Sequence, residues 1–246
     1  MIRQLRLGAM LLRLGIELLR GSWRMRGFDR LSPARRQAAI RAWSRRVLRA
    51  CRCSLQVVGQ PYPQACLVAA NHVSWLDIVA LNASRPTRFV SKADVHRWPL
   101  LGWLAAGAGT LFIERERPRD ALRVVHDMAA CLRDGHQITV FPEGTTSDGS
   151  RILPLHANLF QAAASSGTPV QPVLLRYVDA GGAPSRAAAY IDDDSLLDTL
   201  RRIAAARPAR VIVHYLPVLH GDDRRQLAQA VQDALHAALH TGGGGH

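Results

Sequence analysis

From Cys53 to the end of the chain, short apolar runs alternate with segments of helical periodicity, and this alternation restricts the fold more than any other feature. Eight runs predict strands: Ser54–Val58, Cys66–Ala69, Arg88–Ser91, Thr110–Ile113, Gln137–Phe141, Val170–Tyr177, Ala188–Ile191 and Arg210–Leu216. Six segments predict helices: Trp75–Asn82, Leu100–Ala106, Arg119–Arg133, His156–Ser166, Leu196–Ala205 and Asp223–His240. Alternating strands and helices are typical of an α/β fold with a mainly parallel or mixed central sheet flanked by helices. We therefore expect one α/β domain over residues 51–241, followed by a disordered tail at 242–246.

Positive charge is concentrated in front of this domain. Residues 1–54 contain fourteen arginines and only two acidic residues, Glu17 and Asp29, so they carry +12 of the net charge of +13. A cationic segment attracts phosphates, either in nucleic acid or in anionic lipid headgroups. A solvated basic face is the alternative that this composition leaves open.

The first twenty residues predict an amphipathic helix. Arg6, Arg13, Glu17 and Arg20 fall on one stripe of such a helix, and the rest of its surface is apolar. The longest uncharged run, Leu7–Leu12, is far shorter than the ~20 residues that span a bilayer, and no signal-peptide cleavage pattern follows it. We expect residues 1–50 to form basic amphipathic helices that associate with a membrane surface, the second starting at Ser32-Pro33; packing on the protein's own core is the alternative.

Four cysteines, Cys51, Cys53, Cys66 and Cys131, are too few for a disulfide framework in a chain of this length. The single residue between Cys51 and Cys53 is poor spacing for a zinc site or for a disulfide between them. We therefore expect four reduced thiols and a cytosolic environment.

A candidate catalytic pair follows the second predicted strand. His72 and Asp77 are five residues apart, so they cannot share a face of one regular helix. They can meet if His72 lies in the turn before the helix and Asp77 lies in its first turn. The carboxylate would then fix the imidazole tautomer and leave the other ring nitrogen free to take a proton. Ser74 is better explained as a helix cap than as a nucleophile.

Three further segments stand out. Two carry polar groups at the end of a predicted strand, and the third has a proline within a predicted strand. Arg115 ends the strand that contains Phe112 and could bind a phosphate through two hydrogen bonds. Phe141–Ser147 contains a Pro-Glu-Gly turn that offers a carboxylate and bare backbone amides. Pro172 interrupts an apolar strand, which indicates an edge strand or a bulge.

In order and spacing, these four segments resemble the motifs of the glycerolipid acyltransferase family. Asn71–Asp77 resembles its motif of a His and an Asp separated by four residues, Phe112–Arg115 its second motif, Phe141–Thr145 its third, and Pro172 falls in its fourth. The resemblance covers about residues 50–180. Each motif is modest alone, but four in register are specific.

The resemblance implies acyl transfer from acyl-CoA or acyl carrier protein to a lysolipid hydroxyl, with no metal and no cofactor. It implies an enzyme of phospholipid biosynthesis on the cytoplasmic face of a bacterial inner membrane, held there peripherally or monotopically. The catalytic residues would be His72 as general base and Asp77. The residues expected to bind substrate are Arg115, Glu143, Gly144, Thr145 and Thr146.

The acceptor is the least determined part of this hypothesis. Family members that act on lysophosphatidic acid commonly carry Arg where this chain has Thr146, although Arg115 remains and Arg151 could substitute. We expect 1-acyl-glycerol 3-phosphate as the acceptor, with lyso-ornithine lipid or another lysophospholipid as the alternative. An acyl-ester hydrolase could use the same pair. A nucleic-acid-binding protein fits less well, because the basic front has few aromatic residues and leucine-rich stretches.

Overall fold

The computed structural model describes residues 2–92, 110–113, 118–191 and 194–241. It contains seven strands: β1 (Cys53–Val58), β2 (Leu67–Ala70), β3 (Arg88–Lys92), β4 (Leu111–Ile113), β5 (Ile138–Val140), β6 (Val170–Asp179) and β7 (Ala209–Tyr215). It contains seven α-helices: α1 (Ile2–Met25), α2 (Pro33–Ala50), α3 (Leu76–Ser84), α6 (Pro118–Arg133), α7 (Gln161–Ser166), α8 (Leu196–Ala205) and α9 (Arg224–Thr241). Two 3₁₀ helices complete the described elements: η1 (Phe28–Arg30) and η2 (Ala157–Phe160).

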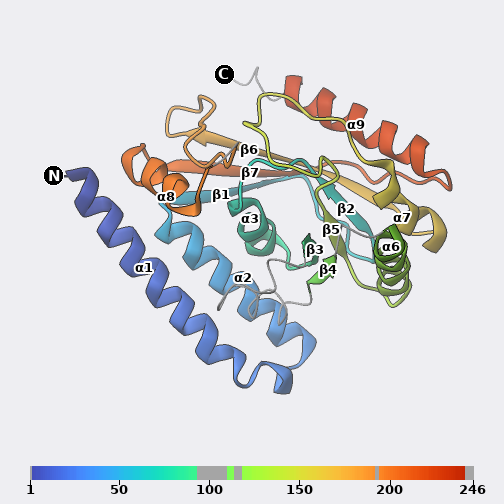
Figure 1. Ribbon diagram of the computed structural model, residues 1–246, viewed down its shortest axis with the longest axis horizontal. Helices are drawn as coiled ribbons and strands as arrows, with labels where there is room; N and C mark the ends of the chain where they lie inside the picture. Colours follow the sequence, from blue (N-terminus) through green and yellow to red (C-terminus); the bar gives the residue numbers. More distant parts are fainter. Residues whose placement is uncertain (1, 93–109, 114–117, 192–193, 242–246) are drawn as a thin grey trace.

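The strands form one mixed sheet in the order β1-β7-β6-β2-β5-β3-β4. Every neighbouring pair in it is parallel except β6 and β7, which are antiparallel. Helices cover both faces (Figure 1), and each face has its own apolar core. The helices α2, α3 and α8 pack on one face, and α6, α7 and α9 pack on the other. The predicted fold class is therefore confirmed.

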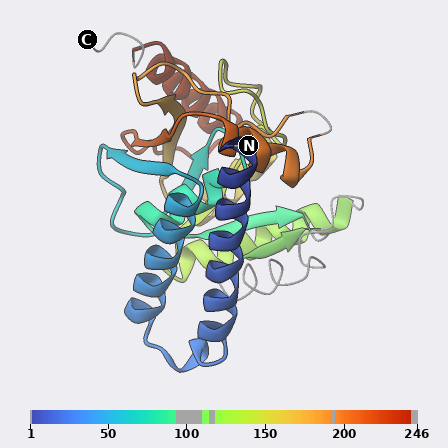
Figure 2. The ribbon, with the colours of Figure 1, turned by 90° about the vertical axis from the view of Figure 1, so that its left-hand side faces the viewer.

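The first two helices form a hairpin that projects from the sheet (Figure 2). The hairpin is held by Glu17 of α1, whose carboxylate pairs with Arg46 of α2 at 2.8 Å and whose carbonyl accepts from the Trp43 indole at 2.8 Å. On the other side, the Arg45 guanidinium of α2 donates to the Ala83 carbonyl of α3 over 3.0 Å. The predicted helix start at Ser32-Pro33 is found, with Pro33 as the first helical residue.

Two sequence predictions about the fold need correction. Ala188–Ile191 is not a strand, because its backbone bonds to loops: the Tyr190 amide donates to the Val73 carbonyl over 2.9 Å. The 3₁₀ helix η2 takes the place of the first turn of the helix that was expected from His156. The helix expected at Leu100–Ala106 and the tail at 242–246 lie outside the described residues.

Pro172 does not mark an edge strand, because β6 lies between β2 and β7. The Pro172 carbonyl accepts from the Leu216 amide over 3.0 Å, but proline has no N–H to return to Leu216. The side-chain amide of Gln171 supplies that hydrogen bond to the Leu216 carbonyl instead, over 3.1 Å. The bulge alternative fits. Val173 pairs with Tyr215, and Val170 forms a bridge with Leu219. Between these two pairs β6 covers three residue steps and the chain that follows β7 covers four, so one residue has no opposite partner.

Candidate functional site

The loops that follow β2 and β5 meet at the carboxyl ends of these two strands. The two strands are parallel neighbours, with Ala69 opposite Val140, so their carboxyl ends lie side by side. The loop after β2 carries His72, and the loop after β5 carries Glu143. The structure thus brings together two of the segments that the sequence singled out.

His72 and Asp77 are in direct contact. The Nδ1 atom of His72 lies 2.8 Å from Oδ2 of Asp77, the second residue of α3. The same Oδ2 accepts hydrogen bonds from the backbone amides of Val73 at 2.7 Å and Ser74 at 2.9 Å. The Asp77 side chain has no exposed surface, so these donors replace the water that its charge has lost.

The His72 ring has a stacking contact in addition to the hydrogen bond at Nδ1. It stacks on the Phe141 ring with a centroid separation of 3.9 Å and an interplanar angle of 12°. About a fifth of the side chain, 20%, remains exposed, and Nε2 has no hydrogen-bond partner among the described residues. One ring nitrogen is therefore fixed by a carboxylate, and the other is available to a substrate.

The backbone of His72 is fixed by the third motif. Its amide donates to Oε1 of Glu143 over 3.2 Å, and its carbonyl accepts from the Ser147 amide over 2.8 Å. Ser74, by contrast, is fully buried, and its hydroxyl accepts from the Leu76 amide at the start of α3. The Ser74 hydroxyl is thus engaged by the first residue of α3, but the N-cap residue of this helix is Trp75, which corrects the predicted cap at Ser74.

Glu143, which the sequence predicts to bind substrate, lies beneath the loop that carries His72. Its side chain is buried, and no described residue forms a hydrogen bond with Oε2. Burial raises the pKa of Glu143 to about 7, against the opposing effect of hydrogen bonds from the backbone amides of His72 and Leu153, and the charge of Asp77 raises it further. The observed contact of Glu143 is thus with the His72 backbone, and its contact with substrate stays a prediction.

The residues after Glu143 shape the loop. Gly144 has a φ of +73°, a conformation that favours glycine, and a Cβ there would lie 2.9 Å from the His156 imidazole, so a larger residue would also have to displace that ring. Thr145 is exposed. The Thr146 hydroxyl donates to the Tyr190 carbonyl, which ties it to the loop before α8.

Arg115 lies outside the described residues, so its expected phosphate contact stays a prediction. The strand that leads to it, β4, ends at Ile113 and runs parallel to β3, which in turn runs parallel to β5. Arg151 is exposed. A different arginine, Arg186, pairs with Asp148 in this loop at 2.8 Å.

Sequence reasoning missed Tyr177, whose hydroxyl donates to Oδ1 of Asp77 over 2.7 Å. A tyrosine in an apolar strand is easily taken for core. The signal that could have found it is alternation along β6, which places Tyr177 on the same face as Val173 and Leu175, where α3 packs. A buried tyrosine hydroxyl on that face needs a polar partner.

The four cysteines are unpaired thiols. Burial raises the pKa of Cys51, Cys53 and Cys66 to about 12, so these three are unreactive thiols in the core. Within the described ranges there is no group of three or more His, Cys, Asp or Glu side chains that could hold a metal ion.

Comparison with known proteins agrees with this geometry. The sequence model of the Acyltransferase family matches residues 54–176. The chain is 39% identical to a lyso-ornithine lipid O-acyltransferase of Pseudomonas aeruginosa, over 83% of this chain and 79% of that protein. It is 35% identical to a 1-acyl-sn-glycerol-3-phosphate acyltransferase of Neisseria meningitidis, over 93% of this chain and 91% of that protein. Its fold resembles the crystal structure of the 1-acyl-sn-glycerophosphate acyltransferase of Thermotoga maritima with a TM-score of 0.76 at 16% identity, over 99% of this chain and 97% of that one.

Proposed function

This chain belongs to the Acyltransferase family, and from that premise we propose that His72 and Asp77 catalyse transfer of a fatty acyl group to the free hydroxyl of a lysolipid. The observation that carries the proposal is the fixed pair itself. Nδ1 of His72 is bonded to the fully buried carboxylate of Asp77, while Nε2 has no partner in the part of the chain that the structure describes. A neutral imidazole held in this way is a general base near neutral pH.

The transfer proceeds by direct attack of the acceptor. Nε2 of His72 takes the proton of the lysolipid hydroxyl as its oxygen attacks the thioester carbonyl, and the imidazolium is stabilised by Asp77. The tetrahedral intermediate then collapses, the C–S bond breaks, and the imidazolium returns the proton to the leaving thiolate. The products are an ester and a free thiol, and no acyl-enzyme forms. The donor is acyl-CoA or acyl carrier protein.

The proposed acceptor is 1-acyl-glycerol 3-phosphate, which yields phosphatidic acid for phospholipid synthesis. The relative from Neisseria meningitidis, which is named for this acceptor, aligns with 93% of the chain, more than the 83% covered by the Pseudomonas relative. Lyso-ornithine lipid is the second candidate, and Thr146 favours it. A threonine provides no guanidinium to bind a phosphate at this position. The Thr146 hydroxyl donates to the Tyr190 carbonyl instead.

A panel of acceptors tests the proposal. Purified enzyme is given one labelled acyl-CoA, or the matching acyl carrier protein, with lysophosphatidic acid, lyso-ornithine lipid and lysophosphatidylethanolamine in turn. We expect a new diacyl lipid by mass, formed fastest with lysophosphatidic acid. Faster product from lyso-ornithine lipid selects the second acceptor. Thioester consumption that releases only free fatty acid contradicts acyl transfer and supports a hydrolase.

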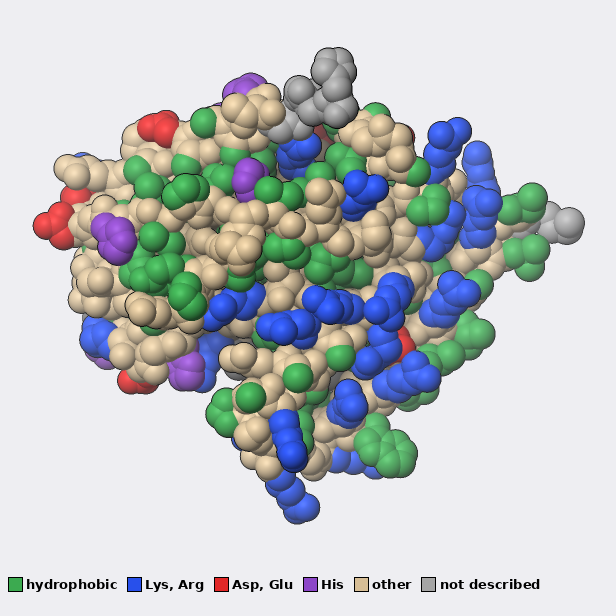
Figure 3. Space-filling model, turned by 180° about the vertical axis from the view of Figure 1, so that it is seen from behind, with side chains coloured by type: hydrophobic (Ala, Val, Ile, Leu, Met, Phe, Trp, Pro, Cys, Tyr) green, Lys and Arg blue, Asp and Glu red, His purple; other side chains and the backbone are tan. Residues whose placement is uncertain are grey.

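The site is proposed to work at the cytoplasmic membrane face, with residues 1–50 as the docking segment. A row of exposed apolar side chains, here called the α1 stripe, runs along the helix: Ile2, Leu5, Leu12, Ile16, Leu19 and Trp23. Their spacing of three, four or seven residues puts them on one face. Figure 3 shows basic side chains, which are arginines in this part of the sequence, gathered where α1 and α2 lie, with hydrophobic side chains along the outer rim. None of the described helices combines the length and apolarity needed to cross a bilayer.

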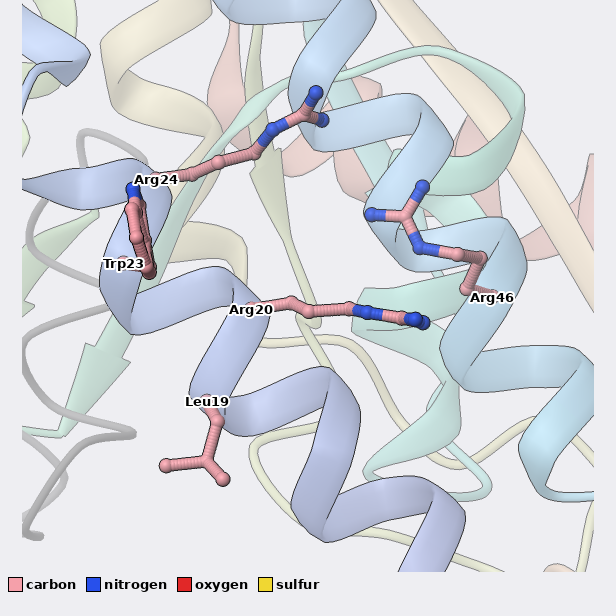
Figure 4. A pocket seen from close by; sticks show the side chains of 5 residues that line it. All are labelled: Leu19, Arg20, Trp23, Arg24 and Arg46. Atoms are coloured by element: carbon pink, nitrogen blue, oxygen red, sulfur yellow. The ribbon is translucent and has the colours of Figure 1, made fainter.

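A groove between α1 and α2 adds a place for lipid phosphates. It is open to solvent, has a volume of about 560 Å³, and is lined by Leu19, Arg20, Trp23, Arg24 and Arg46. Figure 4 shows the guanidinium groups of Arg20 and Arg24 reaching from α1 towards α2, and that of Arg46 reaching back. Among the described residues, the carboxylate that pairs with these guanidinium groups is that of Glu17, which contacts both Arg20 and Arg46. An anionic headgroup here would have acyl chains beside the α1 stripe.

Replacing apolar residues of the α1 stripe tests the docking segment. We expect Leu12→Gln with Leu19→Gln to weaken binding to vesicles of phosphatidylcholine and phosphatidylglycerol at least tenfold, because each leucine contributes about 1.5–3 kcal/mol when fully buried in the acyl region. Leu122→Gln is the matched control, since Leu122 of α6 is 74% exposed and Leu19 is 69% exposed. Co-sedimentation gives both affinities. Equal binding by the double variant and the control would mean that α1 does not dock on the membrane.

A further inference from the structure

Tyr177 contacts the candidate site from within the core. Its side chain is 5% exposed, and its hydroxyl donates to Oδ1 of Asp77 over 2.7 Å. It lies on β6, four residues after Val173, which pairs with Ala70 at the end of β2. β6, which pairs with β2, therefore supplies a hydroxyl to the partner of His72, and His72 itself lies in the loop after β2. Tyr177 lies one residue beyond the part of the chain that matches the Acyltransferase family model.

The two oxygens of the Asp77 carboxylate have separate sets of donors. Oδ2 faces Nδ1 of His72 and accepts from the amides of Val73 and Ser74. Oδ1 accepts from Tyr177, the one donor to it within the described ranges. Without that hydroxyl, Oδ1 is a fully buried anionic oxygen with no partner in this part of the chain. The carboxylate could then rotate away from His72 or take up a proton.

We infer that Tyr177 is a positioning residue: its hydroxyl fixes the Asp77 carboxylate so that Oδ2 faces His72, and it acts on acyl transfer through Asp77. The inference rests on the proposed function of His72 and Asp77. Tyr177 has no contact with substrate in this arrangement, because its hydroxyl ends on the buried side of the carboxylate.

A second buried tyrosine provides a matched control. Tyr215 of β7 is also 5% exposed, and its hydroxyl donates to the Ser84 hydroxyl over 3.1 Å. Ser84 is the last residue of α3, the helix that carries Asp77. Removing either hydroxyl therefore deletes one hydrogen bond between the sheet and the same helix, but only Tyr177 contacts the catalytic pair.

The titratable groups around this contact differ in whether they change charge near neutral pH. Burial, and then the charge of Asp77, raise the pKa of Tyr177 well above its usual value, so it remains a donor. The thiols of Cys51 and Cys53, which face Tyr177, have pKa values raised to about 12 by burial and stay neutral. Glu143, whose pKa is raised to about 7, titrates in the working range, but it does so equally in both tyrosine variants.

Tyr177→Phe separates a positioning role from a packing role. We expect kcat to fall about tenfold with KM unchanged for both substrates. Tyr215→Phe should leave kcat unchanged, even where it lowers the melting temperature as much as Tyr177→Phe does.

A double-mutant cycle tests whether the effect passes through Asp77. In an Asp77→Asn background, Tyr177→Phe should cost less than twofold, because no carboxylate remains to be positioned. Wild-type kcat in Tyr177→Phe, or the same tenfold loss in the Asp77→Asn background, overturns the inference. If His72→Ala and Asp77→Asn kept wild-type activity, the proposed function would be wrong. That outcome is distinguishable from a failure of the Tyr177 inference, in which His72→Ala and Asp77→Asn lose activity but Tyr177→Phe does not.

Discussion

His72→Ala should lower kcat for acyl transfer about 10³-fold or more and leave the fold intact. General bases contribute roughly 10²–10⁴-fold, and no described residue could take over the proton from the position of Nε2. The buried charge of Asp77 would keep three donors after the imidazole is gone: the amides of Val73 and Ser74 and the hydroxyl of Tyr177. The free energy of unfolding should therefore change by no more than about 1–2 kcal/mol.

The measurement is steady-state turnover of labelled acyl-CoA beside thermal unfolding of the same preparation. His214→Ala is the control, because His214 is a half-buried histidine of β7 that has no contact with the pair. We expect the control to keep wild-type turnover. Near-normal turnover in His72→Ala would remove His72 from the mechanism, and a matching loss in both variants would point to a general effect on folding.

Much of the fold could be predicted from local patterns. Strands in a parallel sheet are buried on both faces, so β2 is an uninterrupted apolar segment, and β5 is apolar except for the β-branched Thr139; both are entirely buried. The predicted helix Leu196–Ala205 has the observed bounds, and in the structure Ser195 and Asp198 form a capping box at its start. The predicted strand at Ala188–Ile191 was wrong because an apolar run predicts burial but does not predict hydrogen-bond partners. The partners of this segment lie in the loops after β2 and β5.

The site was predictable only in part, for a related reason. His72 and Asp77 are only five residues apart, and their contact depends on the local geometry of the turn before a helix. The sequence spacing was therefore enough to suggest it. The contacts of Glu143 with the His72 amide and of Tyr177 with Asp77 join residues 71 and 100 positions apart. Such contacts depend on strand order, and nothing in the sequence places β6 and β5 on either side of β2. Long-range partners of a catalytic pair therefore need the structure.

Asp77→Asn should lower kcat by about 10²–10³-fold while His72 keeps its tautomer. Asparagine has one oxygen and one NH₂ group, and the two amides of Val73 and Ser74 both donate to the position of Oδ2. The oxygen must occupy that position, where it still accepts from Nδ1 of His72. The NH₂ group then faces the Tyr177 hydroxyl, which can turn to accept. Only the negative charge is lost.

The size of the effect follows from that charge. An imidazolium about 4 Å from a carboxylate gains about 4 kcal/mol at an effective dielectric constant of about 20, which corresponds to somewhat under three orders of magnitude in rate. In the opposite amide orientation the NH₂ group would force Nδ1 to accept and Nε2 to carry the proton, and the loss would approach the roughly 10⁴-fold known for a wrong tautomer. The pH dependence of turnover, with imidazole ¹⁵N shifts, distinguishes these cases. A loss below tenfold would mean that the charge of Asp77 does not stabilise the transition state, and that it serves only to hold His72 and the start of α3 in place.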